Sequence, residues 1–230
     1  MASGSSGNSY AVDDGESVLL LEAGLQPKKI TSGYLSLLPR VAGCLITHEH
    51  QDHARGAYGI AAAGIDLYAT AGTFSGISDI CHPYRCRTVR ACEQFSSGSW
   101  TVMPFQTEHD AAEPVGFLLY SHTAREKLLF ATDTYYIRYR FSGLNVVMVE
   151  CNYSLTRLIA NAEAGRITES LKRRLLTSHF SFEHVREFLL VNDLSAVRRI
   201  YLLHISSRNV DRTRLEPAIQ QETGIPVTAL

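Results

Sequence analysis

The stretch Ile46-Thr-His-Glu-His-Gln-Asp-His53 places three histidines and one aspartate within six residues. It overlaps the end of the apolar run Ala42–Thr47, which is typical of a buried strand. The Ala/Gly-rich segment Ala54–Ala63 follows it and is typical of a helix. A dense group of imidazole and carboxylate side chains between a strand and a helix indicates a metal-binding loop.

The spacing within this stretch suits metal binding. In extended backbone, alternate residues point to the same side, so His48 and His50 can hold one ion together. Asp52 and His53 come about one turn later and can reach a second ion beside the first. The alternative interpretation is a polar surface loop with an accidental group of histidines.

Two ions need more ligands than this loop offers. Three further residues lie at or just after the end of a predicted strand: His109 after 100–107, Asp133 after 127–132, and His204 at the end of 199–204. Residues at strand ends converge on one rim of a sheet, although a single residue there is more often structural. With the first loop they supply seven N or O ligands and no cysteine, a set that suits Zn²⁺ and also Mn²⁺ or Fe²⁺.

Strands and helices are predicted in two similar series, each rich first in strands and then in helices. The predicted strands are 10–12, 17–22, 42–47, 66–69, 86–90, 100–107, 115–121, 127–132, 146–151, 199–204 and 226–229, and the predicted helices are 27–38, 54–63, 73–80, 155–162, 168–176, 182–191 and 212–222. This order predicts a layered α/β architecture, with two sheets packed together and helices outside.

Composition excludes several classes of protein. The chain has 230 residues, of which 45% are hydrophobic and 20% charged, as in an ordinary globular protein. The apolar runs fall far short of a membrane span of about 20 residues, and the first residues lack the pattern of a secretory signal, so no membrane partner is expected. The five cysteines, an odd number, favour reduced thiols in the cytoplasm.

Charge is unevenly distributed along the chain. Residues 1–115 hold 7 basic and 12 acidic residues, whereas residues 116–230 hold 15 basic and 11 acidic ones. The net charge of −1 gives no reason by itself to expect nucleic acid, but the basic second half permits an anionic substrate. Solvated helix faces are an equally good interpretation of that charge.

Two smaller clusters carry weaker signals. Cys81, Cys86 and Cys92 stand near His82, but their irregular spacing favours free thiols over a structural zinc site. Tyr135-Tyr-Ile-Arg-Tyr-Arg140 combines aromatic and basic residues just after Asp133. That segment either stacks on the bases of a single strand or simply lines the mouth of the site.

Taken together, these residues resemble the metallo-β-lactamase superfamily. Within it, the chain is similar to the small YycJ-type hydrolases, which resemble DNA exonucleases. Besides 46–53, the matching pieces are Ser5-Ser-Gly-Asn-Ser9, Leu20-Leu-Glu-Ala-Gly24, Glu113-Pro-Val-Gly-Phe117, Ala131-Thr-Asp-Thr134, Glu150-Cys-Asn152, Leu171-Lys-Arg173, Ser178-His-Phe-Ser181 and Leu203-His-Ile-Ser-Ser-Arg-Asn209. The resemblance implies a four-layer αββα sandwich that forms one domain over residues 1–230.

The resemblance also implies a site with two metal ions at one edge of the sheets. It assigns the ligands in three sets: His48, His50 and His109 to the first ion, Asp52, His53 and His204 to the second, and Asp133 as the bridge between them. Two departures stand out: Glu22 occupies a position where the family usually has Asp, and Tyr153-Ser154 replaces a His-Asp pair. The first should matter little because that loop only supports the site, whereas any role of the second pair is lost.

The expected activity is phosphodiester hydrolysis, with DNA as the substrate of an exonuclease. A metal-bridging hydroxide would attack phosphorus, with Asp52 as metal ligand and orienting group. His179 is expected to give a proton to the leaving group or to contact phosphate, unless it is only a neighbour of the helix cap Ser181.

Several further residues are expected to contact the substrate. Those after the last ligand are Ser206, Ser207 and Asn209, and those on predicted helices are Lys172, Arg173, Arg174 and Arg186. The plainer alternatives are a turn and two solvated helix faces. Two other functions compete with a nuclease: a hydrolase of the same fold for a cyclic phosphodiester, lactone or thioester, and a binding protein that keeps its metals without turnover.

Overall fold

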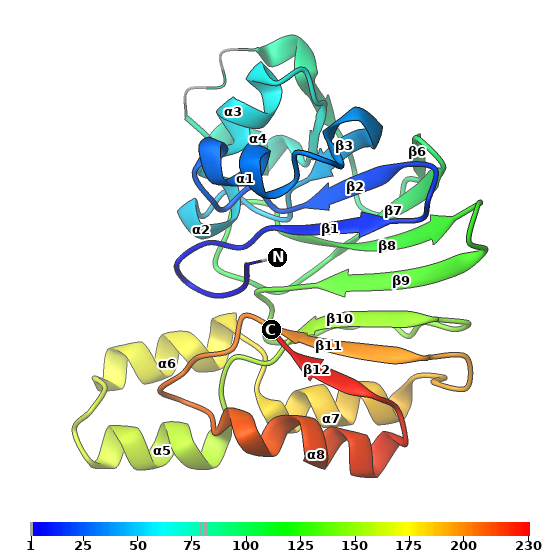
Figure 1. Ribbon diagram of the computed structural model, residues 1–230. Helices are drawn as coiled ribbons and strands as arrows, with labels where there is room; N and C mark the ends of the chain where they lie inside the picture. Colours follow the sequence, from blue (N-terminus) through cyan, green and yellow to red (C-terminus); the bar gives the residue numbers. More distant parts are fainter. Residues whose placement is uncertain (1, 79, 81) are drawn as a thin grey trace. The chain divides into compact units, whose positions relative to one another are not determined.

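The computed structural model describes residues 2–78, 80 and 82–230 (Figure 1). The chain divides into two compact units: unit 1 comprises Met1–Gln106 and Ala111–Glu126, and unit 2 comprises Thr107–Asp110 and Lys127–Leu230. Cys81 lies outside the described residues, so the expectation for its cluster stays a prediction. The thiols of Cys86 and Cys92, which are described, are free.

A five-stranded sheet forms the centre of unit 1. Its strands lie in sequence order, as β1 (Tyr10–Asp13), β2 (Val18–Leu21), β3 (Val41–Leu45), β4 (Leu67–Ala69) and β5 (Cys86–Thr88). The first pair is antiparallel and the other pairs are parallel. Strand β2 is buried at every residue, as a parallel strand covered on both faces should be.

Helices cover one face of this sheet, as Figure 1 shows. They are α1 (Pro27–Gly33), α2 (Gln51–Ala54), α3 (Ala57–Ala62) and α4 (Ala71–Gly76), with short 3₁₀ turns at Leu38–Arg40 and Pro83–Arg85. Ile30 of α1 and Ile60 of α3 share one buried core with Cys44 of β3. Burial of this apolar face holds such short helices in place.

The three predicted helices of unit 1 have other bounds than expected. The predicted helix 27–38 ends at Gly33, the predicted helix 73–80 is α4 at Ala71–Gly76, and the predicted helix 54–63 is interrupted between α2, which ends at Ala54, and α3. The division falls at Gly56, where a Cβ atom would lie 2.2 Å from the carbonyl oxygen of Leu25. Close approach of two backbones, rather than helix propensity, therefore sets the boundary.

Three antiparallel strands complete unit 1. They are β6 (Phe95–Ser97), which the sequence did not predict, β7 (Trp100–Gln106) and β8 (Val115–Ser121). The carboxylate of Asp14, in the turn between β1 and β2, accepts hydrogen bonds from the hydroxyls of Ser99 at 2.6 Å and Ser121 at 2.7 Å. Partial burial raises the pKa of Asp14, but these bonds outweigh it and lower the pKa to about 2.

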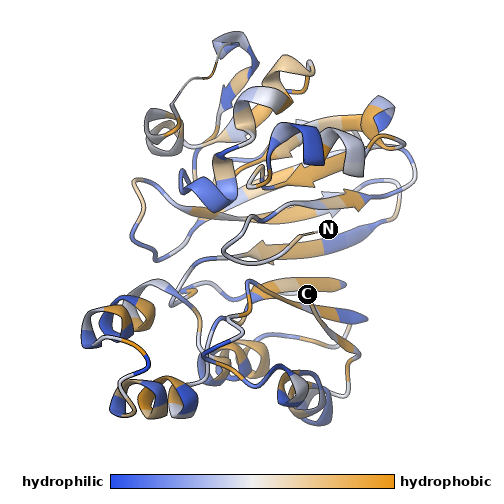
Figure 2. Ribbon diagram, turned by 60° about the vertical axis from the view of Figure 1, so that its left-hand side comes forward, coloured by the Kyte–Doolittle hydropathy of each residue, from blue (hydrophilic) through white to orange (hydrophobic). Residues whose placement is uncertain are grey.

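Unit 2 contains four parallel strands and four helices. The strands, in spatial order, are β9 (Glu126–Ala131), β10 (Val146–Glu150), β11 (Arg199–Leu203) and β12 (Val227–Ala229). The helices are α5 (Leu155–Glu163), α6 (Glu169–Ser178), α7 (Phe182–Val191) and α8 (Arg212–Thr223). Figure 2 shows largely hydrophobic strands, whereas the helices carry both hydrophobic and hydrophilic sides.

Local sequence explains where these helices begin. Each has a capping residue whose side chain accepts a hydrogen bond from the first turn: Ser154, Thr168, Ser181 and Asp211. The predicted elements from residue 100 onward all appear, with bounds within two residues of those expected. The predicted α/β class is therefore confirmed. No helix within the described residues is long and apolar enough to cross a membrane.

Candidate metal centre

A first group of candidate metal ligands lies in unit 1, in the loop between β3 and α2. The rings of His48 and His53 are buried with centroids 4.2 Å apart, and those of His48 and His50 lie 4.7 Å apart. An oxygen of Asp52 lies 3.6 Å from Nε2 of His53. The loop thus brings together all four residues that its spacing predicted; we call them the loop group.

Two residues from the start of the chain hold His53 in place. Glu22 follows β2 and is fully buried; its Oε1 lies 3.6 Å from Nδ1 of His53, and its Oε2 accepts the N–H of Thr47 at 3.4 Å. Burial raises the pKa of Glu22. The side-chain amide of Asn8 lies 3.1 Å from Nε2 of His53. From the sequence, Glu22 was expected to support the site, whereas no role was expected for Asn8.

The second group lies in unit 2 and comes from four separate places in the chain. Asp133 follows β9, Glu150 ends β10, His179 lies between α6 and α7, and His204 follows β11. One ligand atom from each lies within 4.8 Å of the others. We call these four residues the strand-end group. It contains two predicted ligands, Asp133 and His204, and His179, which was expected to take part in catalysis.

Glu150 is the centre of the strand-end group. Its Oε1 lies 2.6 Å from Nδ1 of His179 and 3.1 Å from Nδ1 of His204. Its Oε2 accepts the backbone N–H groups of Thr134 at 3.0 Å and Phe180 at 3.1 Å. A carboxylate occupied in this way orients both imidazoles through their Nδ1 atoms.

Charge supports this arrangement. Burial raises the pKa of Glu150, but attraction by His179 outweighs it and holds that pKa below its usual value. Burial likewise lowers the pKa of His179, and the Glu150 carboxylate more than reverses the effect. Each of the two side chains therefore stabilises the charged form of the other. The sequence analysis quoted Glu150 in a matching piece but gave it no role; its signal was a carboxylate at the end of a buried strand.

His109 is placed by the short segment of unit 2 that precedes Asp110. Its Nδ1 lies 2.7 Å from the carbonyl oxygen of Ser178, and its Nε2 lies 3.8 Å from an oxygen of Asp133. A carbonyl oxygen can only accept, so Nδ1 carries the proton and Nε2 is left as a ligand atom. Burial lowers the pKa of His109 and so favours the neutral ring that binds metals.

Backbone strain marks three residues of this region. Glu22, Asp133 and His204 have φ angles of 66°, 46° and 50°, in the left-handed region. Each costs about 1–2 kcal/mol for a residue with a side chain. All three come directly after or one residue beyond a strand, and strain of this kind concentrates at functional sites. The left-handed conformation gives each of these side chains a direction that differs from the up-and-down alternation along the preceding strand.

The chemistry of the donors fits divalent metal ions. Both groups offer imidazole nitrogens and carboxylate oxygens, the ligands of catalytic zinc, manganese and iron sites. In each group a buried glutamate lies behind a histidine, which is the usual outer support of metal-binding imidazoles.

The three predicted phosphate contacts after His204 differ in burial and in their hydrogen bonds. Asn209 is buried, and its carboxamide oxygen accepts a hydrogen bond from the Asn161 side chain at 3.0 Å. The backbone N–H of Ser206 donates to the carbonyl of Asn152 at 3.0 Å, and Ser207 is exposed. The structure therefore gives Asn209 a part in the fold and leaves the Ser207 side chain accessible.

The basic residues of α6 and α7 lie on the surface of unit 2. Lys172 lies 3.4 Å from a carboxylate oxygen of Glu169, and Arg173 is exposed. Two further arginines are also in ion pairs: Arg174 with Asp110, and Arg186 with Glu222. Exposed pairs of this kind are weak and can exchange for a phosphate.

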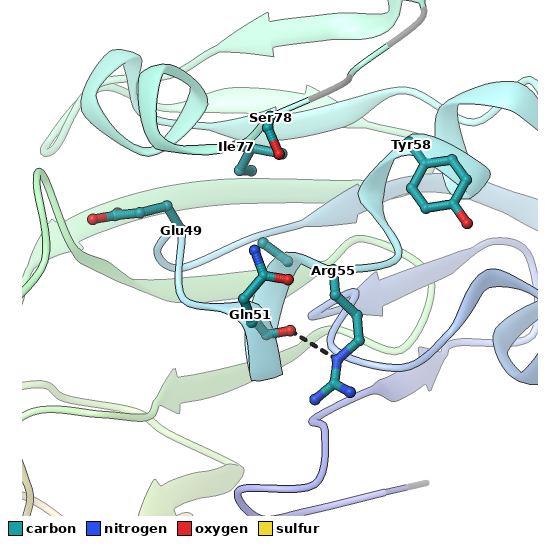
Figure 3. Close-up of a pocket in the computed structure, with 7 residues that line it drawn as sticks. Glu49, Gln51, Arg55, Tyr58, Ile77 and Ser78 are labelled. Atoms are coloured by element: carbon teal, nitrogen blue, oxygen red, sulfur yellow. Dashed lines mark hydrogen bonds between the residues drawn. The ribbon is translucent and has the colours of Figure 1, made fainter.

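A pocket of about 460 Å³ lies beside the metal-binding loop in unit 1 (Figure 3). Glu49 and Gln51, which alternate with the loop histidines, line it together with Arg55 and Tyr58. Nε of Arg55 donates to the carbonyl of Gln51 at 3.0 Å, the dashed line in Figure 3. The alternation predicted for the loop thus separates the metal-binding side chains from those that line the pocket.

Comparison with known proteins identifies the class. Residues 19–205 match the model of the beta-lactamase superfamily domain, and the chain belongs to that family. It has the metallo-β-lactamase fold, so the four-layer αββα class expected from the sequence is confirmed, and it is a metal-dependent hydrolase. The family also implies divalent metal ions.

Two of the similar curated proteins are exodeoxyribonucleases. YycJ of Bacillus anthracis is 31% identical over 223 residues, which cover 91% of this chain and 82% of YycJ. WalJ of Streptococcus pneumoniae serotype 2 is 30% identical in an alignment of 249 positions, gaps included. The alignment covers 99% of this chain and 90% of WalJ.

Solved structures show the same fold at low identity. YhfI from Bacillus subtilis has a TM-score of 0.71 at 12% identity and covers 100% of this chain and 90% of its own. The short form of human tRNase Z has a TM-score of 0.59 at 15% identity, and the match covers 97% of this chain and 89% of tRNase Z. These likenesses concern the fold alone.

Proposed function

We propose that this chain is an exodeoxyribonuclease that hydrolyses the phosphodiester bonds of DNA. The observation that carries the proposal is the similarity, over nearly the whole chain, to two proteins named exodeoxyribonucleases. The basic surface of α6 and the two groups of metal-binding side chains are consistent with an anionic substrate and a hydrolytic reaction.

We further propose that the protein acts as a single domain over residues 1–230 and binds two metal ions. The proposed ligands remain those of the sequence analysis: His48, His50 and His109 for one ion, Asp52, His53 and His204 for the other, and Asp133 between them. Zn²⁺ is the proposed ion, with Mn²⁺ or Fe²⁺ as alternatives. When bound, such ions lower the pKa of water and stabilise charge on a phosphoryl oxygen.

The residues of the chain have separate tasks in this proposal. Asp52 orients the nucleophile, next to the imidazole of His53. His179 contacts the leaving group, and its hydrogen bond to Glu150 fixes the orientation of the ring. Glu150 is proposed as a positioning residue, because its two oxygens contact Nδ1 of His179, Nδ1 of His204 and two backbone N–H groups.

Substrate binding is assigned to residues around the strand-end group. We propose that Ser206, Ser207 and Asn209 bind phosphate oxygens near the reacting bond and that Lys172 and Arg173 contact the DNA backbone further away. Of these, Ser207 and Arg173 are exposed. A cytoplasmic location is also a proposal; it rests on the odd number of cysteines.

One experiment tests the function directly. The metal content of protein purified without added metal is measured, and a time course is then run on end-labelled DNA with that metal. We expect shortening of the DNA from an end. Intact linear DNA, intact single strands and intact bis-(p-nitrophenyl) phosphate would overturn the nuclease proposal. Turnover of a lactone or thioester would favour the small-molecule hydrolase, and metal binding without any turnover would favour a binding protein.

A further inference from the structure

A second cavity lies within unit 2, on the side of the segment that follows Asp133. It has a volume of about 220 Å³ and is formed by residues 136–140, Phe180 and α7. Neither the proposed ligands nor the proposed phosphate contacts belong to its lining. The proposed metal site and phosphate contacts therefore assign no role to this cavity.

The floor of this cavity is apolar and partly aromatic. Ile137, Phe180 and Phe188 are 5%, 1% and 6% exposed, and the two phenylalanine rings lie 6.1 Å apart in a tilted arrangement. Tyr136 lines the same cavity but is 55% exposed. A large exposed aromatic side chain beside an apolar floor is suited to a flat, aromatic ligand.

Polar groups around the cavity are available for such a ligand. Nδ1 of His184 is buried and has no hydrogen-bond partner among the described residues. Arg140 is exposed, and the described part of the chain gives it no ion pair or side-chain hydrogen bond. Arg138, by contrast, pairs with Glu108. The cavity thus offers a free positive charge at Arg140, whereas Nδ1 of His184 is shielded from the surface and Glu187 adds an exposed carboxylate to the lining.

The cavity is connected to the strand-end group through the backbone. Phe180 is adjacent to His179, and its N–H donates to Oε2 of Glu150 at 3.1 Å. Tyr136 follows Asp133 by three residues, and its carbonyl accepts the hydroxyl of Thr134 at 2.8 Å. The walls of the cavity are therefore held to the same carboxylate that orients the histidines.

We propose that this cavity binds the base of the terminal nucleotide of a DNA strand, with that base unpaired. The base stacks on Tyr136 above the apolar floor, and Arg140 contacts the adjoining phosphate. Every base has a π-face, so the contact tolerates any sequence. The inference rests on the proposed function and specifies its substrate as a strand end that is single or frayed.

The test uses metal-loaded protein and short single strands whose end carries either an ordinary nucleotide or an abasic one. Terminal phosphorothioate linkages prevent hydrolysis, and affinity is measured by fluorescence anisotropy. Base stacking on an aromatic ring predicts at least about fivefold tighter binding of the strand with a terminal base. Tyr136→Ala should abolish that difference. Tyr84→Ala, at a tyrosine of unit 1 that is 65% exposed, should leave it unchanged.

A second variant separates the base from the phosphate. Arg140→Ala should weaken the binding of both strands to a similar extent and reduce the salt dependence of that binding. Equal affinity of the wild type for the two strands, or a base preference that survives Tyr136→Ala, would overturn the inference. Circular dichroism establishes that Tyr136→Ala is folded; its side chain is exposed, so we expect no loss of structure.

Hydrolysis distinguishes failure of this inference from failure of the proposed function. If unmodified DNA is shortened but an abasic end is removed as fast as a normal end, the cavity does not bind the base. If no DNA is shortened under any metal, the exonuclease proposal itself fails. Tighter binding of a blunt duplex end than of a single strand would also contradict the inference, because a paired base cannot enter the cavity.

Discussion

The two groups of metal-binding side chains are assembled in opposite ways. The loop group comes from His48 to His53, so a few dihedral angles determine how its side chains converge. The strand-end group spans Asp133 to His204 and converges only because β9, β10 and β11 are neighbours in one parallel sheet. Local spacing can therefore be read from the sequence, whereas the second arrangement depends on the tertiary fold.

The supporting carboxylates differ in the same way. Glu22 lies 3.6 Å from one histidine of the loop group. Glu150 lies 2.6 Å and 3.1 Å from two histidines and also accepts two backbone N–H groups. The strand-end group should therefore depend more on its glutamate than the loop group does, because more of its geometry is fixed by that one side chain.

The largest effect is expected from a proposed ligand of the loop group. Asp52→Asn keeps the shape of the side chain but removes its charge. The catalytic contribution of a bound metal is several kcal/mol, so we expect kcat/KM for a phosphodiester to fall by about 1000-fold or more. The assay is hydrolysis of bis-(p-nitrophenyl) phosphate and of end-labelled DNA with saturating metal.

The matched control is Asp193→Asn, at an aspartate that hydrogen-bonds only to the neighbouring Ser195 in the described structure. It should retain wild-type rates. A comparable loss in both variants would mean that carboxylate charge in general, not the loop group, is responsible.

The next largest effect tests the strand-end group. Glu150→Gln retains the volume but replaces one acceptor oxygen with an NH₂ donor, so the two contacts of that oxygen, either to the two imidazoles or to the two backbone N–H groups, are disrupted. We expect metal affinity to fall by about 10- to 100-fold, as for other outer supports of metal-binding histidines. Competition with a chromophoric chelator measures it, and near-UV circular dichroism shows whether the fold is retained. Unchanged affinity would remove Glu150 from the support of the site.

A smaller loss is expected for the corresponding change in the loop group. Glu22→Gln disturbs one long contact to His53 and one to the N–H of Thr47. We expect a decrease in metal affinity of less than about tenfold. A larger decrease than that of Glu150→Gln would reverse the proposed difference between the two groups.

The sequence was sufficient for the loop group and for the strand-end residues that carry their own signal. His48, His50, Asp52 and His53 share one short motif, and Asp133 and His204 each follow an apolar run. From residue 100 the alternation of apolar and polar residues and the helix caps also located every element to within two residues. These signals are local, and local signals are present in a single sequence.

The sequence marks Glu150 only as a carboxylate at the end of a buried strand and does not show its central place in the strand-end group. Its position follows from the order and register of three strands: Val149 pairs with Ala131 and Glu150 pairs with Leu203, which puts Glu150 between the residues that follow β9 and β11. Asn8 depends likewise on where the first residues return to the loop. The break at Gly56 reflects a close approach of Leu25 that propensity does not contain.

The smallest effect concerns DNA binding outside the metal site. Removing Lys172 and Arg173 together should weaken binding of a single strand several-fold and reduce the slope of log affinity against log salt by up to about 1.4, because each phosphate contact contributes about 0.7. The double variant Lys28→Ala/Lys29→Ala removes the same charge from exposed positions on α1 of unit 1. If the basic half of the chain binds DNA, only the first variant lowers the slope. An equal reduction in both would indicate non-specific attraction, and no reduction in the first would exclude α6 from the interface.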